Sequence, residues 1–155
     1  MNPTDKKSDI PARVEQEHAH LRRALEELRA SASSVAEGED FAQWRLELMW
    51  QVRDFKNDLL KHFDLEEEGG FMRDVRRQVP NSDPQVNELL EEHREMELTM
   101  DRVLVTLKAM RERDDQELTR LQQEIDEFIS TALEHETTEQ HLLQRSYYRD
   151  YGGPE

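Results

Sequence analysis

Apolar residues recur along the chain at alternating steps of three and four residues, which is the period of an α-helix that buries one face. In the first such stretch, the buried face is expected to carry Val14, Leu21, Leu25 and Leu28. Three more stretches with the same period follow, separated by glycines, a proline or a charged turn. The pattern therefore predicts helices at about residues 10–36, 41–68, 84–111 and 115–147. No segment shows the alternation of apolar and polar residues that is typical of a β-strand.

Four amphipathic helices joined by short connections predict an all-α fold, an antiparallel up-down-up-down four-helix bundle. In this interpretation residues 10–148 form the bundle. A polar N-terminal tail at residues 1–9 precedes it, and a C-terminal tail at residues 149–155 follows it. A connector with one or two helical turns is expected between the second and third helices.

The composition alone would leave disorder open as an alternative. Of the 155 residues, 36 are acidic and 21 are basic, so the formal net charge is −15, and only 35% of the residues are hydrophobic. Chains of low hydrophobicity and high net charge are often disordered. The helical period argues against disorder, because it places most of the charge on the solvent-facing sides of long helices.

The excess of negative charge argues against nucleic acid and anionic membranes as partners, because both would repel the chain. No apolar run approaches the ~18 residues that a membrane span requires. Residues 1–9 also lack the apolar stretch of a secretory signal, so we expect a cytoplasmic protein. The chain contains no cysteine, which excludes thiolate metal sites, iron–sulfur clusters and cysteine nucleophiles.

Polar residues that interrupt the apolar faces of all four helices are the main functional signal. Four of the six histidines lie on these faces, and three glutamates each follow one of those histidines by four residues. A spacing of four places two side chains on the same side of a helix, about one turn apart. The candidate metal ligands are His18, His62, Glu66, His93, Glu97, His135 and Glu139.

The four histidines are expected at a similar height in the bundle. His18 and His93 lie nearer the N-terminal ends of their helices, whereas His62 and His135 lie nearer the C-terminal ends. In an antiparallel bundle these positions fall in roughly one layer. His62 follows His18 by 44 residues (62 − 18), and His135 follows His93 by 42 (135 − 93), so the chain resembles two helical hairpins related by a pseudo-two-fold axis.

Each of these residues also has an ordinary structural interpretation. A single histidine on an apolar face is usually a hydrogen-bonded core residue, and a glutamate near a helix end often reaches solvent. Several carboxylates and imidazoles in one buried layer are different, because burying unpaired charge costs several kcal/mol per ion. Metal ions would remove that cost, so we interpret the layer as a metal site. His20 and His141 lie off these faces and are expected at the surface.

The candidate ligands restrict the identity and number of the metal ions. Nitrogen and oxygen ligands without sulfur suit iron, manganese or zinc. Seven ligands exceed the four of a tetrahedral zinc site, so two metal ions are more natural than one. Among the four candidate histidines, only His18 forms the Glu-x-x-His pair of ferritin-like dimetal proteins, with Glu15, which argues against that class.

Four short motifs, one in each predicted helix, contain these candidates. They are Glu17-His18-x-x-Leu21, His62-Phe63-x-x-Glu66-Glu67, Glu92-His93-x-x-Met96-Glu97 and His135-Glu136-x-x-Glu139. In this order, with a helical hairpin between successive pairs, they resemble the hemerythrin-like, or HHE cation-binding, family. The resemblance covers nearly the whole chain, from about residue 11 to residue 151.

The resemblance implies a non-haem di-iron centre inside the bundle, with two iron ions joined by an oxo or hydroxo bridge and with manganese or zinc less favoured. The four histidines would supply nitrogens, and Glu66 and Glu139 match the carboxylates that bridge the two ions. Glu97 would be a terminal ligand, and it stands where oxygen-carrying hemerythrins have a histidine. Exchanging a neutral imidazole for an anion should favour the ferric state, which argues against stable, reversible carriage of O₂.

Three functions agree with these features. The first is a soluble protein that binds iron and a small ligand such as O₂ or peroxide, for binding, sensing or buffering, with an unidentified protein partner for any sensing. The alternative is a di-iron redox enzyme that oxidises ferrous iron or consumes peroxide or nitric oxide. The third is a metal-free helical interaction protein, which the core histidines disfavour. We rank metal and small-ligand binding first because it requires the fewest assumptions, and the sequence leaves open whether the protein is an enzyme.

Overall fold

The computed structural model of the chain describes residues 3–35 and 40–148, with side chains from residue 9 onward. Five helices contain nearly all of these residues, and none of the described residues forms a strand. The helices are α1 Pro3–Ser33, α2 Asp40–Glu67, α3 Phe71–Gln78, α4 Asp83–Ala109 and α5 Asp115–Tyr147. The predicted C-terminal tail at residues 149–155 lies outside the described part of the chain.

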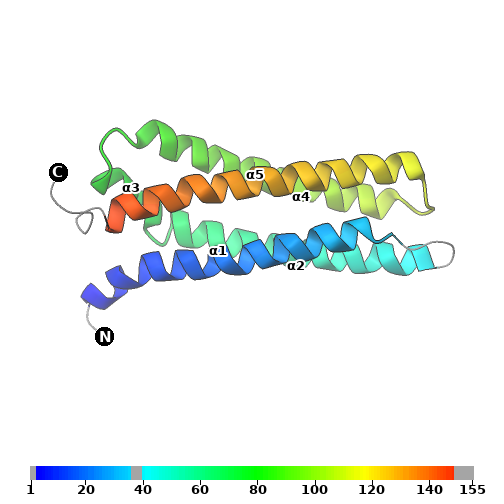
Figure 1. Cartoon of the computed structure of the whole chain (residues 1–155), viewed down its shortest axis with the longest axis horizontal. Coiled ribbons are helices and arrows are strands. Elements are labelled where there is room, and N and C mark those ends of the chain that lie inside the picture. Colours follow the sequence, from blue (N-terminus) through cyan, green and yellow to red (C-terminus); the bar gives the residue numbers. More distant parts are fainter. Residues whose placement is uncertain (1–2, 36–39, 149–155) are drawn as a thin grey trace.

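The four long helices form an antiparallel up-down-up-down bundle (Figure 1). α1 packs against α2 and α5, and α4 packs against the same two helices. α1 and α4 therefore occupy one diagonal of the bundle, and α2 and α5 occupy the other. The all-α bundle predicted from the helical period is confirmed.

The short helix α3 closes the end of the bundle at which α1 begins and α5 ends (Figure 1). It packs against α2, α4 and α5. Gly70 precedes it with a φ of 105°, a left-handed conformation that glycine adopts without the steric cost of a Cβ atom. This turn directs α3 back onto the bundle, where its residues Phe71, Met72 and Val75 are buried.

The helix α1 begins earlier than the sequence predicted. The expected start near residue 10 placed Pro11 in the first turn and treated residues 1–9 as a tail, but α1 begins at Pro3 and contains Pro11 in its interior. Proline removes one helical hydrogen bond, yet its φ is compatible with a helix. Ile10 and Pro11 are both buried, so the helix packs against the bundle at this point.

The core consists of two apolar clusters with a polar layer between them. The larger cluster extends from Leu21, Phe63 and Met96 towards the end of the bundle farther from α3. The smaller cluster includes Val14 and Leu89 and lies against α3. Between the two clusters lie buried polar side chains, each at most 5% exposed: His18, His62, Glu66, His93, His135 and Glu139.

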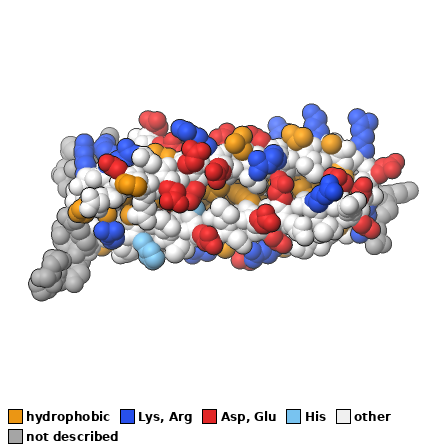
Figure 2. Space-filling view, turned by 90° about the horizontal axis from the view of Figure 1, so that it is seen from above, with side chains coloured by type: hydrophobic (Ala, Val, Ile, Leu, Met, Phe, Trp, Pro, Cys, Tyr) orange, Lys and Arg blue, Asp and Glu red, His pale blue; other side chains and the backbone are white. Residues whose placement is uncertain are grey.

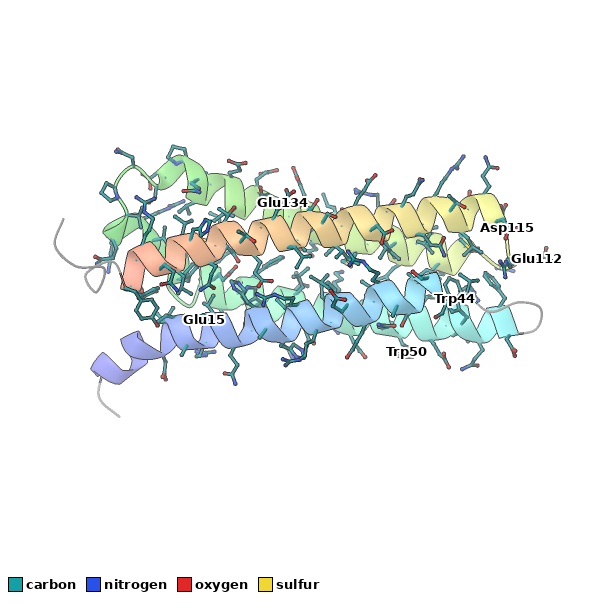
Figure 3. All side chains as sticks on the ribbon, in the orientation of Figure 1. Glu15, Trp44, Trp50, Glu112, Asp115 and Glu134 are labelled. Atoms are coloured by element: carbon teal, nitrogen blue, oxygen red, sulfur yellow. The ribbon has the colours of Figure 1, made fainter. Side chains whose placement is uncertain are left out.

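Charged side chains cover the outside of the bundle. Acidic and basic groups are interspersed on the face seen in Figure 2, and long charged side chains project away from the helices in Figure 3. Trp44 is turned inward instead, and its indole N–H donates a 2.9 Å hydrogen bond to the Ser31 carbonyl, which links α2 to α1. Among the described helices, none has both the length and the apolar composition needed to cross a bilayer.

Replacing Gly70 with alanine should lower the free energy of unfolding by about 1–2 kcal/mol, because a Cβ atom makes the left-handed conformation costly. Urea unfolding followed by circular dichroism measures this change. Asn81 offers a matched control, since its φ of 59° is also positive. Asn81→Gly should therefore keep or raise the stability, and equal destabilisation by both substitutions would contradict the explanation.

Candidate metal centre

The spacing of the buried positions along each helix determines which polar side chains enter the core. After the buried histidine of α1 and of α4, the buried face continues three residues later with an apolar side chain. After the buried histidine of α2 and of α5, it continues four residues later with a glutamate. Each half of the chain therefore contributes two histidines and one glutamate to the layer.

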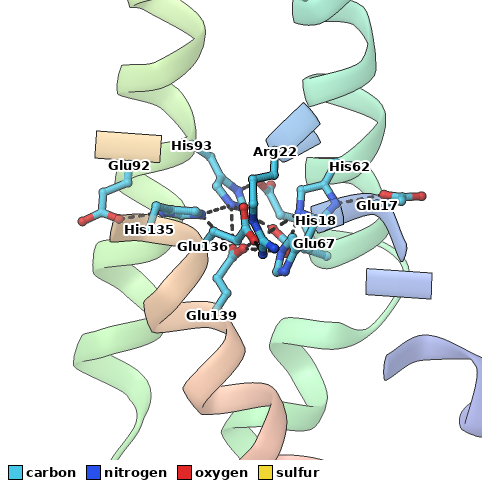
Figure 4. A network of polar contacts seen from close by, with 11 residues as sticks. Glu17, His18, Arg22, His62, Glu67, Glu92, His93, His135, Glu136 and Glu139 are labelled. Atoms are coloured by element: carbon cyan, nitrogen blue, oxygen red, sulfur yellow. Dashed lines mark hydrogen bonds and ion pairs between the residues drawn. The ribbon is translucent and has the colours of Figure 1, made fainter. Parts of the chain in front are cut away.

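The six side chains form two groups of potential metal ligands, and the groups share both glutamates (Figure 4). One group contains His18, His62, Glu66 and Glu139, and the other contains His93, His135, Glu66 and Glu139. Within each group, one possible ligand atom from every residue lies within 4.8 Å of the others.

Each shared glutamate directs one oxygen to each group. Glu139 Oε1 lies 3.1 Å from His18 Nε2, and its Oε2 lies 2.8 Å from His135 Nε2. Glu66 Oε2 lies 2.9 Å from Nε2 of the α2 histidine, and its Oε1 lies 3.1 Å from Nε2 of the α4 histidine. This is the arrangement in which a carboxylate can connect two cations.

Three of the four histidines are oriented by a glutamate outside the layer. The contacts are His62 Nδ1 to Glu17 at 2.8 Å, His93 Nδ1 to Glu67 at 2.7 Å and His135 Nδ1 to Glu92 at 2.7 Å (Figure 4). An ionised carboxylate only accepts hydrogen bonds, so each Nδ1 must carry the proton and donate it. Whenever such a ring is neutral, it presents the lone pair of Nε2 to the interior of the layer, as in metal-binding histidines.

Two of these lone pairs face each other. His93 Nε2 and His135 Nε2 lie 3.1 Å apart. Because both rings already donate through Nδ1, two neutral rings would bring lone pairs together without a proton between them. A cation, either a proton or a metal ion, is needed to make this contact favourable.

Several buried atoms of the layer have no hydrogen-bond partner in the part of the chain that the structure describes. They include His62 Nε2 and both carboxylate oxygens of Glu66, which lie at ion-pair distance from neighbouring atoms of the layer but without hydrogen-bond geometry. An unpaired buried polar atom costs about 1–3 kcal/mol and is uncommon in proteins. These atoms point into the two ligand groups, so metal ions that accept nitrogen and oxygen ligands fit the residues present.

Burial lowers the pKa values of the histidines, whereas the neighbouring carboxylates raise them, and the carboxylates have the larger effect. Burial lowers the pKa of His18, but its contacts with Glu139 and Glu66 outweigh burial and raise the pKa to about 9. The same balance raises the pKa of His93 to about 10. Burial also opposes protonation of His62, but the charge of Glu66 is the main reason that its pKa rises to about 12. The layer therefore attracts positive charge at neutral pH.

The two shared glutamates stay ionised although they are fully buried. Burial and the charge of Glu139 act to raise the pKa of Glu66, but His62 and His18 lower it below the ordinary value of 4.5. Burial acts in the same way on Glu139, and the charge of His135 is the main reason that its pKa is lowered. A buried carboxylate that keeps its charge is well suited to bind a cation.

The structure brings together six of the seven predicted ligands and leaves Glu97 apart from them. Glu97 is half-buried and belongs to neither ligand group. On α4 the buried face continues with Met96, three residues after His93, so Glu97 lies to the side of that face. His20 and His141 are exposed.

Three glutamates outside the layer, called the outer glutamates below, could have been found from their positions next to predicted ligands in the sequence. Glu17, Glu67 and Glu92 belong to the four motifs but were assigned no role there. Each is the sequence neighbour of a predicted ligand, so it lies about 100° away around the helix and points towards a neighbouring helix. In the structure each one reaches a histidine of the neighbouring helix, α2, α4 or α5 respectively.

A family model described as the hemerythrin HHE cation binding domain matches residues 9–147, which include nearly all of the bundle. The chain belongs to this family. The resemblance inferred from the four motifs is thereby confirmed. Comparisons of the hemerythrin HHE chain with curated proteins and with solved structures find no match. Membership in the family indicates cation binding, and the buried histidine–glutamate layer could bind a metal ion.

A small cavity adjoins the polar layer of this hemerythrin HHE domain. Its volume is about 20 Å³, which is enough for one water-sized molecule. Apolar side chains that include Leu59, Met96 and Ala132 form part of its lining. Histidines from both ligand groups and the shared Glu139 form another part. A small molecule in this cavity would therefore lie directly beside the ligand groups.

The raised histidine pKa values predict that the metal-free domain loses stability as the pH rises above about 7. Protonated His18 and His93 stabilise the fold fully below the ordinary pKa of 6.5, and this contribution is lost as the pH rises through their folded values of about 9 and 10. Urea unfolding in the presence of a chelator, between pH 6.5 and 10, measures the trend. His20→Ala should leave the slope unchanged, and a metal-free domain that gains stability over this window would contradict the prediction.

Proposed function

We propose that this chain is an iron-binding protein that holds two non-haem iron ions in the buried layer and takes up a small ligand such as O₂ beside them, for binding, sensing or buffering. His18 and His62 would hold one ion, His93 and His135 would hold the other, and Glu66 and Glu139 would each offer one oxygen to each ion. When bound, iron would supply a redox couple and coordination positions for a small ligand.

The sharing of two carboxylates between two histidine pairs is the observation that carries this proposal. A single ion would leave one histidine pair and half of each carboxylate without a partner. Two ions satisfy both pairs and also separate the facing nitrogens of His93 and His135. The two shared and three outer carboxylates together supply enough negative charge to balance two divalent ions.

The chemistry of the ligands and the family together favour iron. Imidazole nitrogens and carboxylate oxygens suit iron, manganese and zinc. Zinc prefers four ligands around one ion, and it offers no redox chemistry for a small ligand. Iron is also the metal that the resemblance to hemerythrin-like proteins implies.

The cavity beside the layer supports a ligand of one or two heavy atoms. Its largely apolar wall favours an uncharged molecule such as O₂ over an ion. Binding ranks ahead of enzymatic turnover because it requires the fewest assumptions, and Glu97, whose charge argues against reversible carriage of O₂, joins neither ligand group. A di-iron redox enzyme is the alternative.

Anaerobic loading with ferrous iron should give about two iron ions per chain, and His62→Ala and Glu66→Ala should each lower the iron content by about half or more. Both variants should also lose the stabilisation that iron gives to the wild-type chain, because an ion that binds only the folded state raises the melting temperature. Elemental analysis after gel filtration and thermal unfolding of the loaded protein measure the two effects.

Two substitutions serve as controls for this experiment. His20→Ala changes an exposed histidine, and Glu97→Gln changes the half-buried glutamate outside both groups. Neither should alter the iron content. Fewer than about one iron ion per wild-type chain would overturn the two-ion proposal, and loss of iron in His20→Ala equal to that in His62→Ala would show that the helix faces are assigned incorrectly.

Filling the cavity should slow the reaction of the iron-loaded protein with O₂ without removing iron. Ala132→Leu adds more volume than the roughly 20 Å³ available, at a cost in stability of about 1–3 kcal/mol. Stopped-flow absorbance after mixing with O₂ measures the rate. The matched control is Ala12→Leu on the exposed face of α1. Equal rates in Ala132→Leu and the wild type would show that the ligand does not use this cavity.

A further inference from the structure

The polar layer follows the pseudo-two-fold repeat of the chain, which relates α1 to α4 and α2 to α5. The related ligands are His18 and His93, His62 and His135, and Glu66 and Glu139. The glutamate that precedes the first histidine of each half obeys the repeat: Glu17 accepts from His62, and Glu92 accepts from His135. These two outer contacts are therefore equivalent in the two halves.

The repeat fails at the residue after each shared glutamate. In α2 this residue is Glu67, whose carboxylate accepts a 2.7 Å hydrogen bond from His93 Nδ1. In α5 it is Gln140, which carries no charge. His18 is the counterpart of His93, and its buried Nδ1 has no hydrogen-bond partner among the residues that the structure describes. A carboxylate thus supports one of these two histidines and not the other.

The repeat also fails one residue after the histidine of α2. Phe63 stacks on His93 there, with ring centroids 3.8 Å apart and an angle of 12° between the planes. The counterpart of Phe63 in α5 is Glu136, which forms an ion pair with Arg22 of α1 (Figure 4). The opposite charges of this pair cancel, so it adds no net charge beside His18. His93 is held by a hydrogen bond and a stacked ring that His18 lacks.

From these differences we infer that the two metal positions are unequal, and that the His93–His135 position binds its ion more tightly and fills first. The inference rests on the proposed two-ion function. A carboxylate that accepts from Nδ1 makes the ring a better electron donor and holds it in place, and loss of such a contact lowers metal affinity about 10–100-fold. The His93–His135 position has two of these contacts, whereas the His18–His62 position has one.

The exposure of the outer glutamates does not reverse this order. The side chains of Glu67, Glu92 and Glu17 are 41%, 29% and 36% exposed, so solvent screens the three contacts to a similar degree. The difference in metal affinity therefore depends on the number of histidine–carboxylate contacts at each position. The small cavity is lined by both histidines of the weaker position and by only one of the stronger position.

An anaerobic titration of the chelator-stripped chain with ferrous iron, in competition with a chelator of known affinity, tests the inference. The wild type should bind iron in two steps that differ about 10–100-fold in affinity. Glu67→Gln should bring the steps together by weakening the first, and Gln140→Glu should bring them together by strengthening the second. Glu68→Gln is the matched control, because Glu68 is the exposed neighbour of Glu67. It should change neither step.

A crystal structure of the chain loaded with one equivalent of iron locates the first ion directly. Anomalous scattering should place it between His93 and His135. An ion between His18 and His62, or two unchanged steps in a Glu67→Gln variant with the melting temperature of the wild type, would overturn the inference and leave the two-ion function standing. A chain that takes up no iron in the titration would instead overturn the proposed function.

Discussion

The structure depends on a layer of four imidazoles and two carboxylates buried across an otherwise apolar bundle. Removing charged groups from water costs several kcal/mol per ion, and only close partners offset that cost. The imidazoles and carboxylates partner each other and the outer glutamates, but His62 Nε2 and both oxygens of Glu66 are left without hydrogen bonds in the described structure. The attraction between the groups therefore offsets part of the cost, and a bound cation would offset the rest. This explains why the layer favours positive charge so strongly that it raises the pKa values of the histidines.

The layer can exist only because apolar packing holds the helices together on both sides of it. The larger cluster lies on the side away from α3 and contains residues from all four long helices. On the other side α2 ends at Glu67, directly after the layer, and the smaller cluster is completed by Phe71, Met72 and Val75 of α3. The Tyr147 hydroxyl donates a 2.8 Å hydrogen bond to Asp74 and its ring stacks on Phe71, which attaches the end of α5 to this short helix. The short helix α3 thus supplies apolar cover on the side of the layer where α2 ends.

Most of the fold and much of the site could be predicted because both depend on helical periodicity. The step after His62 and His135 is four residues and places a glutamate in the core, which the spacing of the sequence predicted. The same spacing predicted Glu97 as a ligand, whereas the buried face of α4 takes a step of three there and passes through Met96. The outer glutamates were missed for a different reason. Which histidine each one reaches depends on which helices are neighbours, and the period of one helix contains no information about its neighbours.

A repeated helical hairpin explains why the layer contains two similar halves, and it also shows where differences between them must arise. The ligands are of the same type in both halves, so their identity cannot distinguish the two positions. The residues beside the ligands can, because they are free of the constraint to bind a cation. Phe63 and Glu136 illustrate this: they occupy related places and both line the small cavity, yet one presents an aromatic ring and the other a carboxylate. Glu136 is nearly buried, with 11% of its side chain exposed, while its partner Arg22 is 59% exposed. On the α5 side the wall of the cavity therefore continues through an ion pair to the solvent, whereas Phe63 on the α2 side offers no such path.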